Sequence, residues 1–528
     1  YVESKEIADL MGIEAFTALE ELDCHQNQLT SLDVGSNTAL TYLQCYANQL
    51  TYLNMRNGIT DQLSNFNATN NSLTCIETLD LDYATANWTS DNENIDAGVT
   101  FSVICGSENQ DEWYVATTGS DGGGSGTQES PFATIQTGIN ASGDGNTVHV
   151  AMGTYVENLV FGGKNLSLIG ADSSNTIIDG DSVSQVINLN NGEDSTTVIK
   201  NFTLRNGTGW EGNGSAILMD GGDYGPKLEN LYITQNYDNA ITSFGSTFSL
   251  KNSRIINNYG RSLSIQAPQL STIDNVVITG NGEGVEIIGY STAVFTNVTI
   301  SNHVSEAINY VVYIRSSTLT FKNTLIVGNK YGIFTENGGS LKMINSNIVS
   351  NTGRPLEFVR GGSGTIINSI ISNNTNPIIL LDGDNPETAA NFSYSIIEGG
   401  WSSINNEDGG TLVWGSGNID VDPMFVDTAN GNYNLLASSM LINAGHPDST
   451  DSDGTVADIG AYPYLNSYSG PTWYITEAGN DTTATGASDD PFRSIQAALN
   501  FGSDDDTAFV SAGTYNENLV YRYEQSAN

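Results

Sequence analysis

Short runs of alternating hydrophobic and polar residues recur through the middle of the chain, and each run follows an asparagine. Alternation with a period of two is typical of β-strands, and no run shows the 3.6-residue period of a helix. Successive runs begin 22 to 29 residues apart. The pattern predicts a stack of strand–turn–strand rungs, whose corner asparagines we expect to form an internal hydrogen-bonded ladder. These asparagines are Asn201, Asn230, Asn252, Asn275, Asn297, Asn323, Asn345 and Asn368.

A different repeat, 21 to 23 residues long, occupies residues 1–75. It reads Leu-x-Cys-x-x-Asn-x-Leu-x-x-Leu from Leu22 and again from Leu43, and a third copy starts at Phe66. The leucines would face a core, and the repeated asparagines would satisfy backbone groups in each turn. The pattern resembles the leucine-rich repeat, in the short form found in surface proteins of gliding, type IX-secreting bacteria. Three repeats are a minimum for stability, so we expect further repeats upstream.

All four cysteines lie in or just after this region. Cys24 and Cys45 occupy the same position in successive repeats, which predicts two neighbouring buried thiols. Cys75 and Cys105 flank a non-repeating segment, interpreted as a cap or linker over residues 76–110, and we predict that a disulfide between them closes it. A disulfide is typical of an oxidising, extracellular location. No Cys-x-x-Cys pair is present, which argues against a zinc site.

A much longer repeat relates two distant parts of the remaining chain. The segments that begin at Trp113 and Trp473 share Phe-x-(Thr/Ser)-Ile-Gln and Gly-Thr-Tyr-x-Glu-Asn at a constant offset of 360 residues. We predict one complete module over residues 111–466 and the start of a second, truncated module over residues 467–528, in a natural chain that continues as a tandem array. The rungs resemble the right-handed parallel β-helix of the pectin-lyase-like superfamily. The predicted fold class is an all-β solenoid, a right-handed parallel β-helix preceded by a short leucine-rich repeat segment.

The start of each module resembles pectin-methylesterase-like domains, yet the motifs of known β-helix enzymes are missing from the rungs. The Asp-Phe-Ile-Phe-Gly stretch of the esterases and the Asn-Thr-Asp and Gly-His-Gly motifs of polygalacturonases do not occur there. A lyase would need a lysine or arginine base. Lys200 and Lys251 alternate with Glu229 and Asp274 immediately before the corner asparagines, so we interpret them as cross-strand structural pairs. We assign no catalytic residue; an active site built from loops without a motif is the alternative.

Aromatic residues suggest a binding surface. Tyr237 and Tyr259 each stand seven residues after a corner asparagine, so their rings should stack on adjacent rungs. The 29-residue rung carries an inserted loop with acidic and aromatic side chains, which together with the tyrosines could hold sugar rings. The alternative is a tyrosine stack that only covers the sheet. The predicted ligand-binding residues are Trp210, Glu211, Asp220, Asp223, Tyr224, Tyr237 and Tyr259.

An acidic turn near the end of the first module predicts a metal site. Its Asp-x-Asp-Gly core resembles half of an EF-hand loop, and closely spaced carboxylates beside a glycine turn suit Ca²⁺. The alternative is a solvated acidic loop. The predicted Ca²⁺ ligands are Asp448, Asp451, Asp453 and Asp458.

A short motif of aspartate followed by serine or threonine recurs along the chain. Its third residue is small, apolar or threonine, and it resembles the O-glycosylation motif of the same group of bacteria. The predicted modified residues are Ser182, Ser195, Thr428, Ser449, Thr482 and Thr507.

Charge narrows the range of partners. The chain has 60 acidic and 17 basic residues and a formal net charge of −43, which disfavours nucleic acid and anionic membranes, and no apolar run is long enough for membrane insertion. The favoured function is an extracellular, cell-surface protein with a structural and adhesive role, contacting glycans, other surface proteins or copies of itself. The alternatives are a polysaccharide-degrading enzyme of the lyase type and a self-assembling filament subunit.

Overall fold

The computed structural model describes residues 1–107, 109–209, 213–221, 225–303, 310–376, 379–381, 387–406 and 409–521. The chain divides between Ile233 and Thr234 into two compact units, each of which is considered by itself. In both units, short strands pair in parallel with strands one rung away, a rung being one turn of the solenoid. No helix in the described ranges is long and apolar enough to cross a membrane.

The first unit opens with two narrow parallel sheets, ordered β1–β3–β5 and β2–β4–β6–β7. The register stacks Leu22 on Leu43 and Leu43 on Phe66, and all three side chains are buried. The side chains of Asn48 and Asn71 each accept a 3.0 Å hydrogen bond from a leucine N–H of the preceding repeat. The repeated asparagine therefore satisfies backbone groups between turns. The strands are β1 (Glu21–Asp23), β2 (Ser31–Asp33), β3 (Tyr42–Gln44), β4 (Tyr52–Asn54), β5 (Asn65–Asn67), β6 (Cys75–Glu77) and β7 (Thr100–Ser102).

The segment after these repeats is closed by a disulfide between Cys75 and Cys105, whose Cα atoms lie 6.0 Å apart. It contains helix α1 (Leu81–Asn87) and the buried Trp88. Cys24 and Cys45 are free and fully buried, and burial raises the pKa of the Cys24 thiol to about 12. These two cysteines therefore serve as small hydrophobic core residues.

The first unit continues as the early rungs of a parallel β-helix. Three columns of strands run through it: β8–β9–β12–β15–β18, β10–β13–β16 and β11–β14–β17. Its elements are β8 (Glu112–Val115), α2 (Ile135–Ala141), β9 (Thr147–Val150), β10 (Gly153–Val156), β11 (Leu159–Val160), β12 (Ser167–Gly170), β13 (Thr176–Asp179), β14 (Ile187–Leu189), β15 (Val198–Lys200), β16 (Thr203–Arg205), β17 (Gly214–Asp220), β18 (Lys227–Glu229) and β19 (Tyr232–Thr234).

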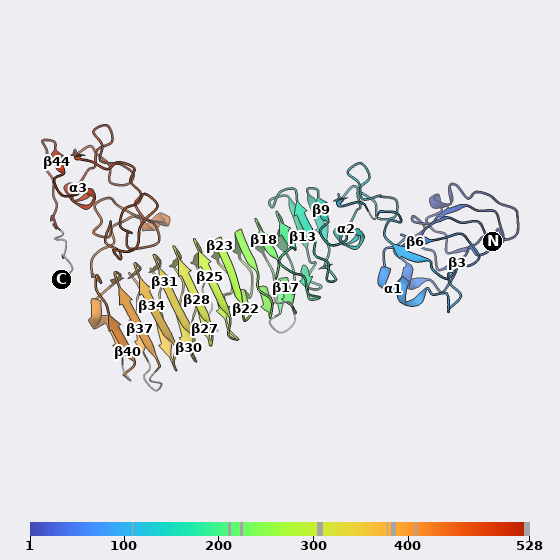
Figure 1. Cartoon of the computed structure of the whole chain (residues 1–528), viewed down its shortest axis with the longest axis horizontal. Helices are drawn as coiled ribbons and strands as arrows, with labels where there is room; N and C mark the ends of the chain where they lie inside the picture. Colours follow the sequence, from blue (N-terminus) through green and yellow to red (C-terminus); the bar gives the residue numbers. More distant parts are fainter. Residues whose placement is uncertain are drawn as a thin grey trace. The chain divides into compact units, whose positions relative to one another are not determined.

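The second unit carries the regular β-helix, in which successive arrows lie side by side in Figure 1. One column runs β21–β23–β25–β28–β31–β34–β37–β40. The long strand β23 also pairs with β26, which begins a second column, β26–β29–β32–β35–β38. A third face is built by β20–β22–β24–β27–β30–β33–β36–β39. The strands are β20 (Asn239–Phe244), β21 (Ser249–Ile256), β22 (Arg261–Gln266), β23 (Leu270–Thr279), β24 (Glu283–Ile287), β25 (Thr292–Thr296), β26 (Thr299–Ser301), β27 (Val312–Arg315), β28 (Thr318–Lys322), β29 (Leu325–Val327), β30 (Ile333–Glu336), β31 (Ser340–Ile344), β32 (Asn347–Val349), β33 (Leu356–Val359), β34 (Ser363–Ile367), β35 (Ile370–Ser372), β36 (Ile379–Leu381), β37 (Ala389–Ser393), β38 (Ile396–Ile397), β39 (Ile404–Asn406) and β40 (Thr411–Trp414).

The core of this unit is a set of side-chain columns along the solenoid axis. In one column Phe295, Phe321, Met343, Ile366 and Phe392 occupy matched positions on successive rungs and are fully buried. Parallel strands in register place like residues on like residues, so each rung buries its apolar face only against its neighbours. The predicted β-helix is thereby confirmed.

The corner asparagines form a hydrogen-bonded ladder, but the prediction that this ladder is internal is wrong. Their backbone φ angles are positive, between 45° and 67°, a left-handed conformation that asparagine tolerates better than most residues. Within single units, amide–amide bonds join Asn230 to Asn201 and Asn275 to Asn252, each at 2.8 Å. Apart from the buried Asn368, these side chains are exposed or half-buried. They stabilise the corners from outside, because a left-handed corner residue turns its side chain away from the core.

A second, buried ladder lies six residues further along each rung of the second unit. The side-chain oxygen of an asparagine in this ladder accepts the backbone N–H of the preceding member, for example Asn258 from Asn236 at 3.1 Å and Asn351 from Asn329 at 2.9 Å. His303 takes the place of one asparagine. The members are Asn236, Asn258, Asn281, His303, Asn329, Asn351 and Asn374. This inner ladder satisfies backbone groups where the chain turns inside the stack.

The charged residues before the outer corners lie opposite one another on neighbouring strands, as predicted. The register places Lys200 directly opposite Glu229 and Lys251 directly opposite Asp274. Opposite charges on one face of neighbouring strands favour that register.

The last elements of the second unit repeat the first elements of the β-helix in the first unit. After an antiparallel pair, β41 (Phe425–Asp427) and β42 (Asn432–Leu435), come β43 (Thr472–Ile475), α3 (Ile495–Phe501) and β44 (Thr507–Val510). These last three elements repeat β8, α2 and β9 at the same offset of 360 residues. The sequence repeat is therefore also a structural repeat.

Candidate functional site

A groove of about 510 Å³ crosses three successive rungs of the second unit, at β20, β22 and β24. On these strands Ile241, Leu263 and Val285 point into the core, which leaves the alternate positions facing outward. The groove is lined by Asp238, Asn239, Phe244, Gly260, Arg261, Ser264, Gln266, Glu283 and Glu286. Its floor is thus rigid strand and its wall is the turn that precedes each strand.

Arg261 organises the charge in this groove. Its guanidinium forms two ion pairs of 2.7 Å, one to Glu283 and one to Glu286 on the next rung. Glu286 also accepts a 3.1 Å hydrogen bond from the Ser264 hydroxyl. All three charged side chains are at most about a quarter exposed. The pairing holds both carboxylates in place, an arrangement suited to hydrogen bonding with a ligand.

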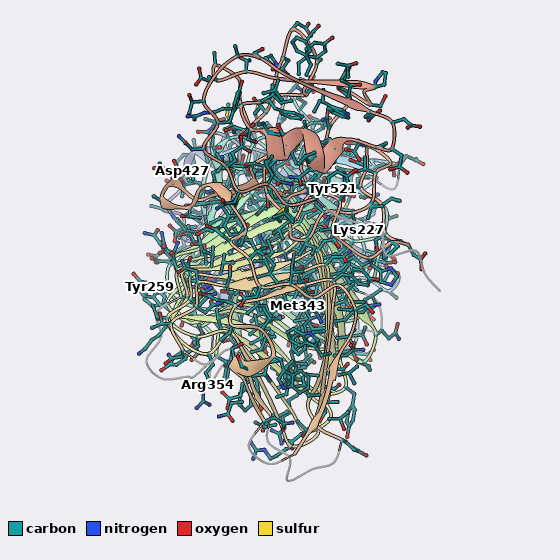
Figure 2. The ribbon with its side chains drawn as sticks, turned by 90° about the vertical axis from the view of Figure 1, so that its left-hand side faces the viewer. Lys227, Tyr259, Met343, Arg354, Asp427 and Tyr521 are labelled. Carbon is teal, nitrogen blue, oxygen red and sulfur yellow. A yellow bond between two sulfur atoms is a disulfide. The ribbon has the colours of Figure 1, made fainter. Side chains whose placement is uncertain are left out.

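Two tyrosines stand at the head of the groove. The rings of Tyr237 and Tyr259 stack with centroids 5.2 Å apart and planes 17° from parallel, and the residues are 49% and 65% exposed. Each directly precedes a residue that lines the groove, Asp238 or Gly260. In Figure 2 Tyr259 lies at the outer margin of the molecule, whereas the core residue Met343 lies within it. The predicted tyrosine stack therefore forms, and it leaves a broad aromatic surface open to solvent.

Further aromatic side chains follow on the next rungs of the same face. Tyr310 stacks on Tyr313 with ring centroids 4.7 Å apart, and Phe334 lies 5.9 Å from Tyr313. The Tyr313 hydroxyl donates a 2.5 Å hydrogen bond to Glu336, which also pairs with Arg360. Burial, reinforced by Glu336, raises the pKa of Tyr313, so its hydroxyl stays protonated and keeps its bond to Glu336. Aromatic and charged groups thus continue along this face from β22 to β30.

Of the other predicted ligand-binding residues, Asp220 is exposed at the end of β17 in the first unit. Trp210, Glu211, Asp223 and Tyr224 lie outside the described residues. Neither Arg261 nor its two glutamate partners were among the predicted ligand-binding residues.

The Ca²⁺ site predicted in the acidic turn is not assembled. Asp451 accepts the backbone N–H of Asp458 at 2.8 Å, and Asp453 accepts that of Asn466 at 2.8 Å. The two oxygens of Asp458 accept backbone N–H groups at 2.7 Å, and burial raises its pKa to about 7. Asp448 is almost fully exposed. Within the described ranges no three histidine, cysteine or acidic side chains gather so as to hold a metal ion. Asp451, Asp453 and Asp458 instead accept backbone N–H groups in and around the turn.

The six predicted O-glycosylation residues lie at the surface. Ser182, Ser195, Thr428, Thr482 and Thr507 are exposed and Ser449 is half-buried. Their modification stays a prediction.

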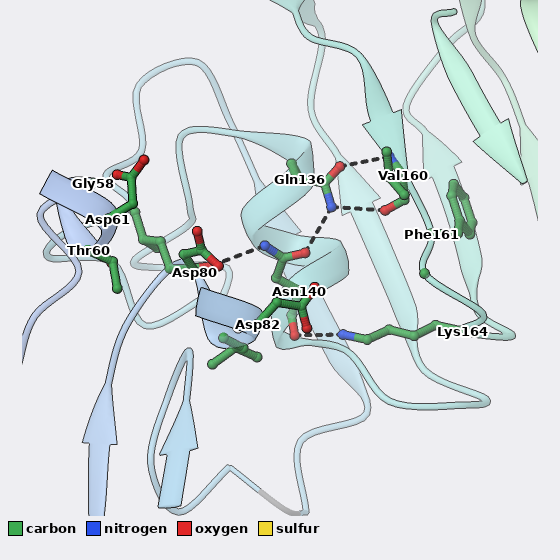
Figure 3. Close-up of a pocket in the computed structure, with 13 residues that line it drawn as sticks. Gly58, Thr60, Asp61, Asp80, Asp82, Gln136, Asn140, Val160, Phe161 and Lys164 are labelled. Atoms are coloured by element: carbon green, nitrogen blue, oxygen red, sulfur yellow. Dashed lines mark hydrogen bonds between the residues drawn. The ribbon is translucent and has the colours of Figure 1, made fainter. Parts of the chain in front are cut away.

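A second cleft, of about 480 Å³, lies in the first unit between the N-terminal repeats and α2 (Figure 3). The Lys164 ammonium donates to the carbonyls of Ile139 and Asn140, at 2.8 and 2.7 Å, and burial lowers its pKa. Asp80 accepts the N–H of Tyr83 at the start of α1. Both charged groups thus serve helix ends, the lysine at a C-terminus and the aspartate at an N-terminus.

A family model of known proteins agrees with this architecture. Residues 267–425 match the family model described as a right handed beta helix region. A crystal structure of pectate lyase Pel9A is similar over 67% of this chain and 96% of its own, with 14% identity and a TM-score of 0.46. The catalytic domain of a GH87 alpha-1,3-glucanase in complex with nigerose matches over 54% of this chain and 67% of its own, with 13% identity and a TM-score of 0.36. A rhamnogalacturonan lyase matches over 60% of this chain and 91% of its own, with 11% identity and a TM-score of 0.28.

No curated protein sequence matches the chain. The family match and the parallel strand register define the class of protein: a right-handed parallel β-helix.

Proposed function

We propose that the chain is an extracellular structural and adhesive β-helix protein that binds glycan chains. Binding would use the tyrosine groove, which we define as Tyr237 and Tyr259 together with the groove on β20, β22 and β24. The observation that supports this most strongly is the exposed, stacked tyrosine pair on adjacent rungs, each member next to a groove residue.

The chemistry of the tyrosine groove suits sugars. A sugar ring has a face of C–H groups that gains free energy by packing on an aromatic ring away from water, and a rim of hydroxyls that need hydrogen-bond partners. Carboxylates accept from hydroxyls, while guanidinium and amide groups donate to them. Because the groove is built on paired strands, little side-chain or backbone entropy should be lost on binding.

Charge favours a neutral glycan over an acidic one. The groove contains Asp238, Glu283 and Glu286 against the single cation Arg261, and the whole chain has a formal charge of −43. A polyanionic uronate chain would be repelled on approach. A neutral polymer would meet no such barrier and could bond to the oxygens that Arg261 leaves open.

A panel of polysaccharides tests this proposal. We expect affinity gel electrophoresis to show retardation by at least one neutral polymer, such as a glucan, xylan or mannan, and none by polygalacturonate or alginate. Uronate polymers incubated with the protein and Ca²⁺ should give no ultraviolet absorbance from unsaturated product. Formation of that product would contradict the adhesive function and support the lyase alternative, and failure to bind any neutral polymer would refute glycan binding through this groove.

A further inference from the structure

The two copies of the β8–α2–β9 unit meet different neighbours in the chain. We call each copy a cap; the first spans residues 112–150 and the second residues 472–510. The first cap contacts the N-terminal repeats and the disulfide-closed segment after them, and the second contacts the segment that follows β42. These neighbours share neither sequence nor fold, so any contact common to both reveals what the cap itself recognises.

Two backbone carbonyls accept hydrogen bonds from the neighbour in both copies. The Asp121 carbonyl accepts from the Arg56 guanidinium at 3.0 Å, and the equivalent Asp481 carbonyl accepts from the Ala437 N–H at 2.7 Å. The Gly124 carbonyl accepts from Arg56 at 2.6 Å. The equivalent Ala484 carbonyl accepts from the Tyr464 hydroxyl, also at 2.6 Å. In the first cap one guanidinium donates to both carbonyls, whereas in the second cap a backbone N–H and a phenol hydroxyl donate to the two equivalent carbonyls.

One side-chain amide donates to the neighbour in both copies. Asn140, on α2, donates to the Leu79 carbonyl at 3.3 Å, a bond drawn in Figure 3. The equivalent Asn500, on α3, donates to the carbonyls of Ala437 and Ser439 at 2.9 and 2.8 Å. The shared chemistry is therefore two fixed acceptors and one fixed donor.

The same internal bonds hold these groups in both caps. The Asp121 carboxylate accepts two backbone N–H groups just before α2, and Asp481 does so just before α3. Gln136 donates to the Asn140 oxygen at 2.8 Å, and the equivalent Gln496 donates to Asn500 at 2.9 Å. Each asparagine is thereby oriented with its NH₂ group toward the neighbour.

We propose that the cap is a docking socket for the domain that precedes it in the chain, made of the carbonyls of residues 121 and 124, or 481 and 484, and the amide of Asn140 or Asn500. Its partner is a preceding domain that offers hydrogen-bond donors and one or two free backbone carbonyls at its end. Two of the three groups that the cap contributes are backbone carbonyls. The socket therefore recognises where the neighbour places its hydrogen-bonding groups and tolerates different neighbour sequences. A module of this kind can follow either another β-helix module or an unrelated domain.

Hydrogen exchange of the full chain, followed by mass spectrometry, tests the socket. In Asn500→Asp the retained oxygen still accepts from Gln496, but a carboxylate replaces the donor that faces two carbonyls. We expect the amide of Ala437, which bonds to Asp481, to exchange at least tenfold faster, while β23–β40 are unchanged. Asn140→Asp should likewise speed exchange around Leu79. Asn480→Asp is the matched control, because Asn480 is exposed in the same cap and bonds only within it.

A response in one cap but not the other would overturn the shared socket, as would wild-type exchange in both variants. If Asn500→Asp also exposes α3, Tyr464→Phe decides the question, because it removes a donor from the neighbour and leaves the cap sequence intact. Faster exchange across residues 481–487 would then support the socket, and unchanged exchange would refute it.

Discussion

Replacing Asn329 with leucine is expected to lower the local free energy of unfolding of the β-helix around β26–β30 by about 4 kcal/mol. Asn329 is 1% exposed. Its oxygen accepts from the backbone N–H and from the ring of His303, both at 3.1 Å, and its NH₂ donates to the Ile300 carbonyl at 3.0 Å. Leucine fills a similar volume but leaves these buried groups without partners, and each unsatisfied group costs about 1–3 kcal/mol.

Hydrogen exchange localises this effect. A loss of about 4 kcal/mol corresponds to exchange roughly a thousandfold faster in the strands of these rungs. The matched control is Asn323→Gly in the outer ladder, because glycine tolerates the positive φ of 48° and only one exposed 3.3 Å bond is lost. We expect the control to cost less than about 1 kcal/mol. Equal effects of the two substitutions would contradict the distinction between the ladders.

Acidification is expected to destabilise the same rungs through His303. Burial lowers the pKa of this histidine to about 4, although its hydrogen bond to Asn329 acts in the opposite direction. The unfolded chain has the ordinary histidine pKa of about 6.5. Between these values the unfolded state binds a proton that the folded state excludes, so stability is unaffected above about pH 6.5 and falls as the pH drops toward 4. The expected loss is about 2.5 kcal/mol at pH 4.5.

The variant His303→Asn isolates this contribution, because asparagine is the usual member of the inner ladder and does not titrate. Other groups, including Asp458 with its pKa of about 7, titrate in both proteins and cancel in the comparison. We expect exchange in β26–β30 to rise more on going from pH 7 to pH 4.5 in the wild type than in the variant, after correction for the intrinsic rate. Parallel pH profiles would show that His303 does not carry the acid sensitivity.

The sequence was sufficient to predict the solenoid, because strand alternation and a rung of about 22 residues are local properties that leave few alternatives. It also located the polar corners, yet it assigned the internal ladder to the wrong asparagines. The signal was present, since an asparagine or histidine stands six residues after each outer asparagine from Asn230 to Asn368. Periodicity alone does not show which of two equally spaced polar residues faces inward. The positive φ of the corner residue decides this.

The tyrosine groove was only partly predictable for a related reason. The corners Asn252 and Asn275 are 23 residues apart, but Arg261 pairs with Glu283, 22 residues on. One extra residue between corner and strand shifts the register, so the pairing of Arg261 with its glutamates could not be read from the repeat. The calcium prediction failed because the spacing of carboxylates does not reveal whether backbone N–H groups already occupy them.

Calorimetric titration of the wild type and of Tyr259→Ala, with the best neutral polymer of the panel, tests glycan binding through the tyrosine groove most directly. Tyr290→Ala, which removes an exposed tyrosine beyond the far end of β24, is the control. We expect Tyr259→Ala to weaken binding at least tenfold, because the sugar loses its aromatic platform. The control should bind like the wild type. Equal affinity of the wild type and Tyr259→Ala would contradict the proposed function.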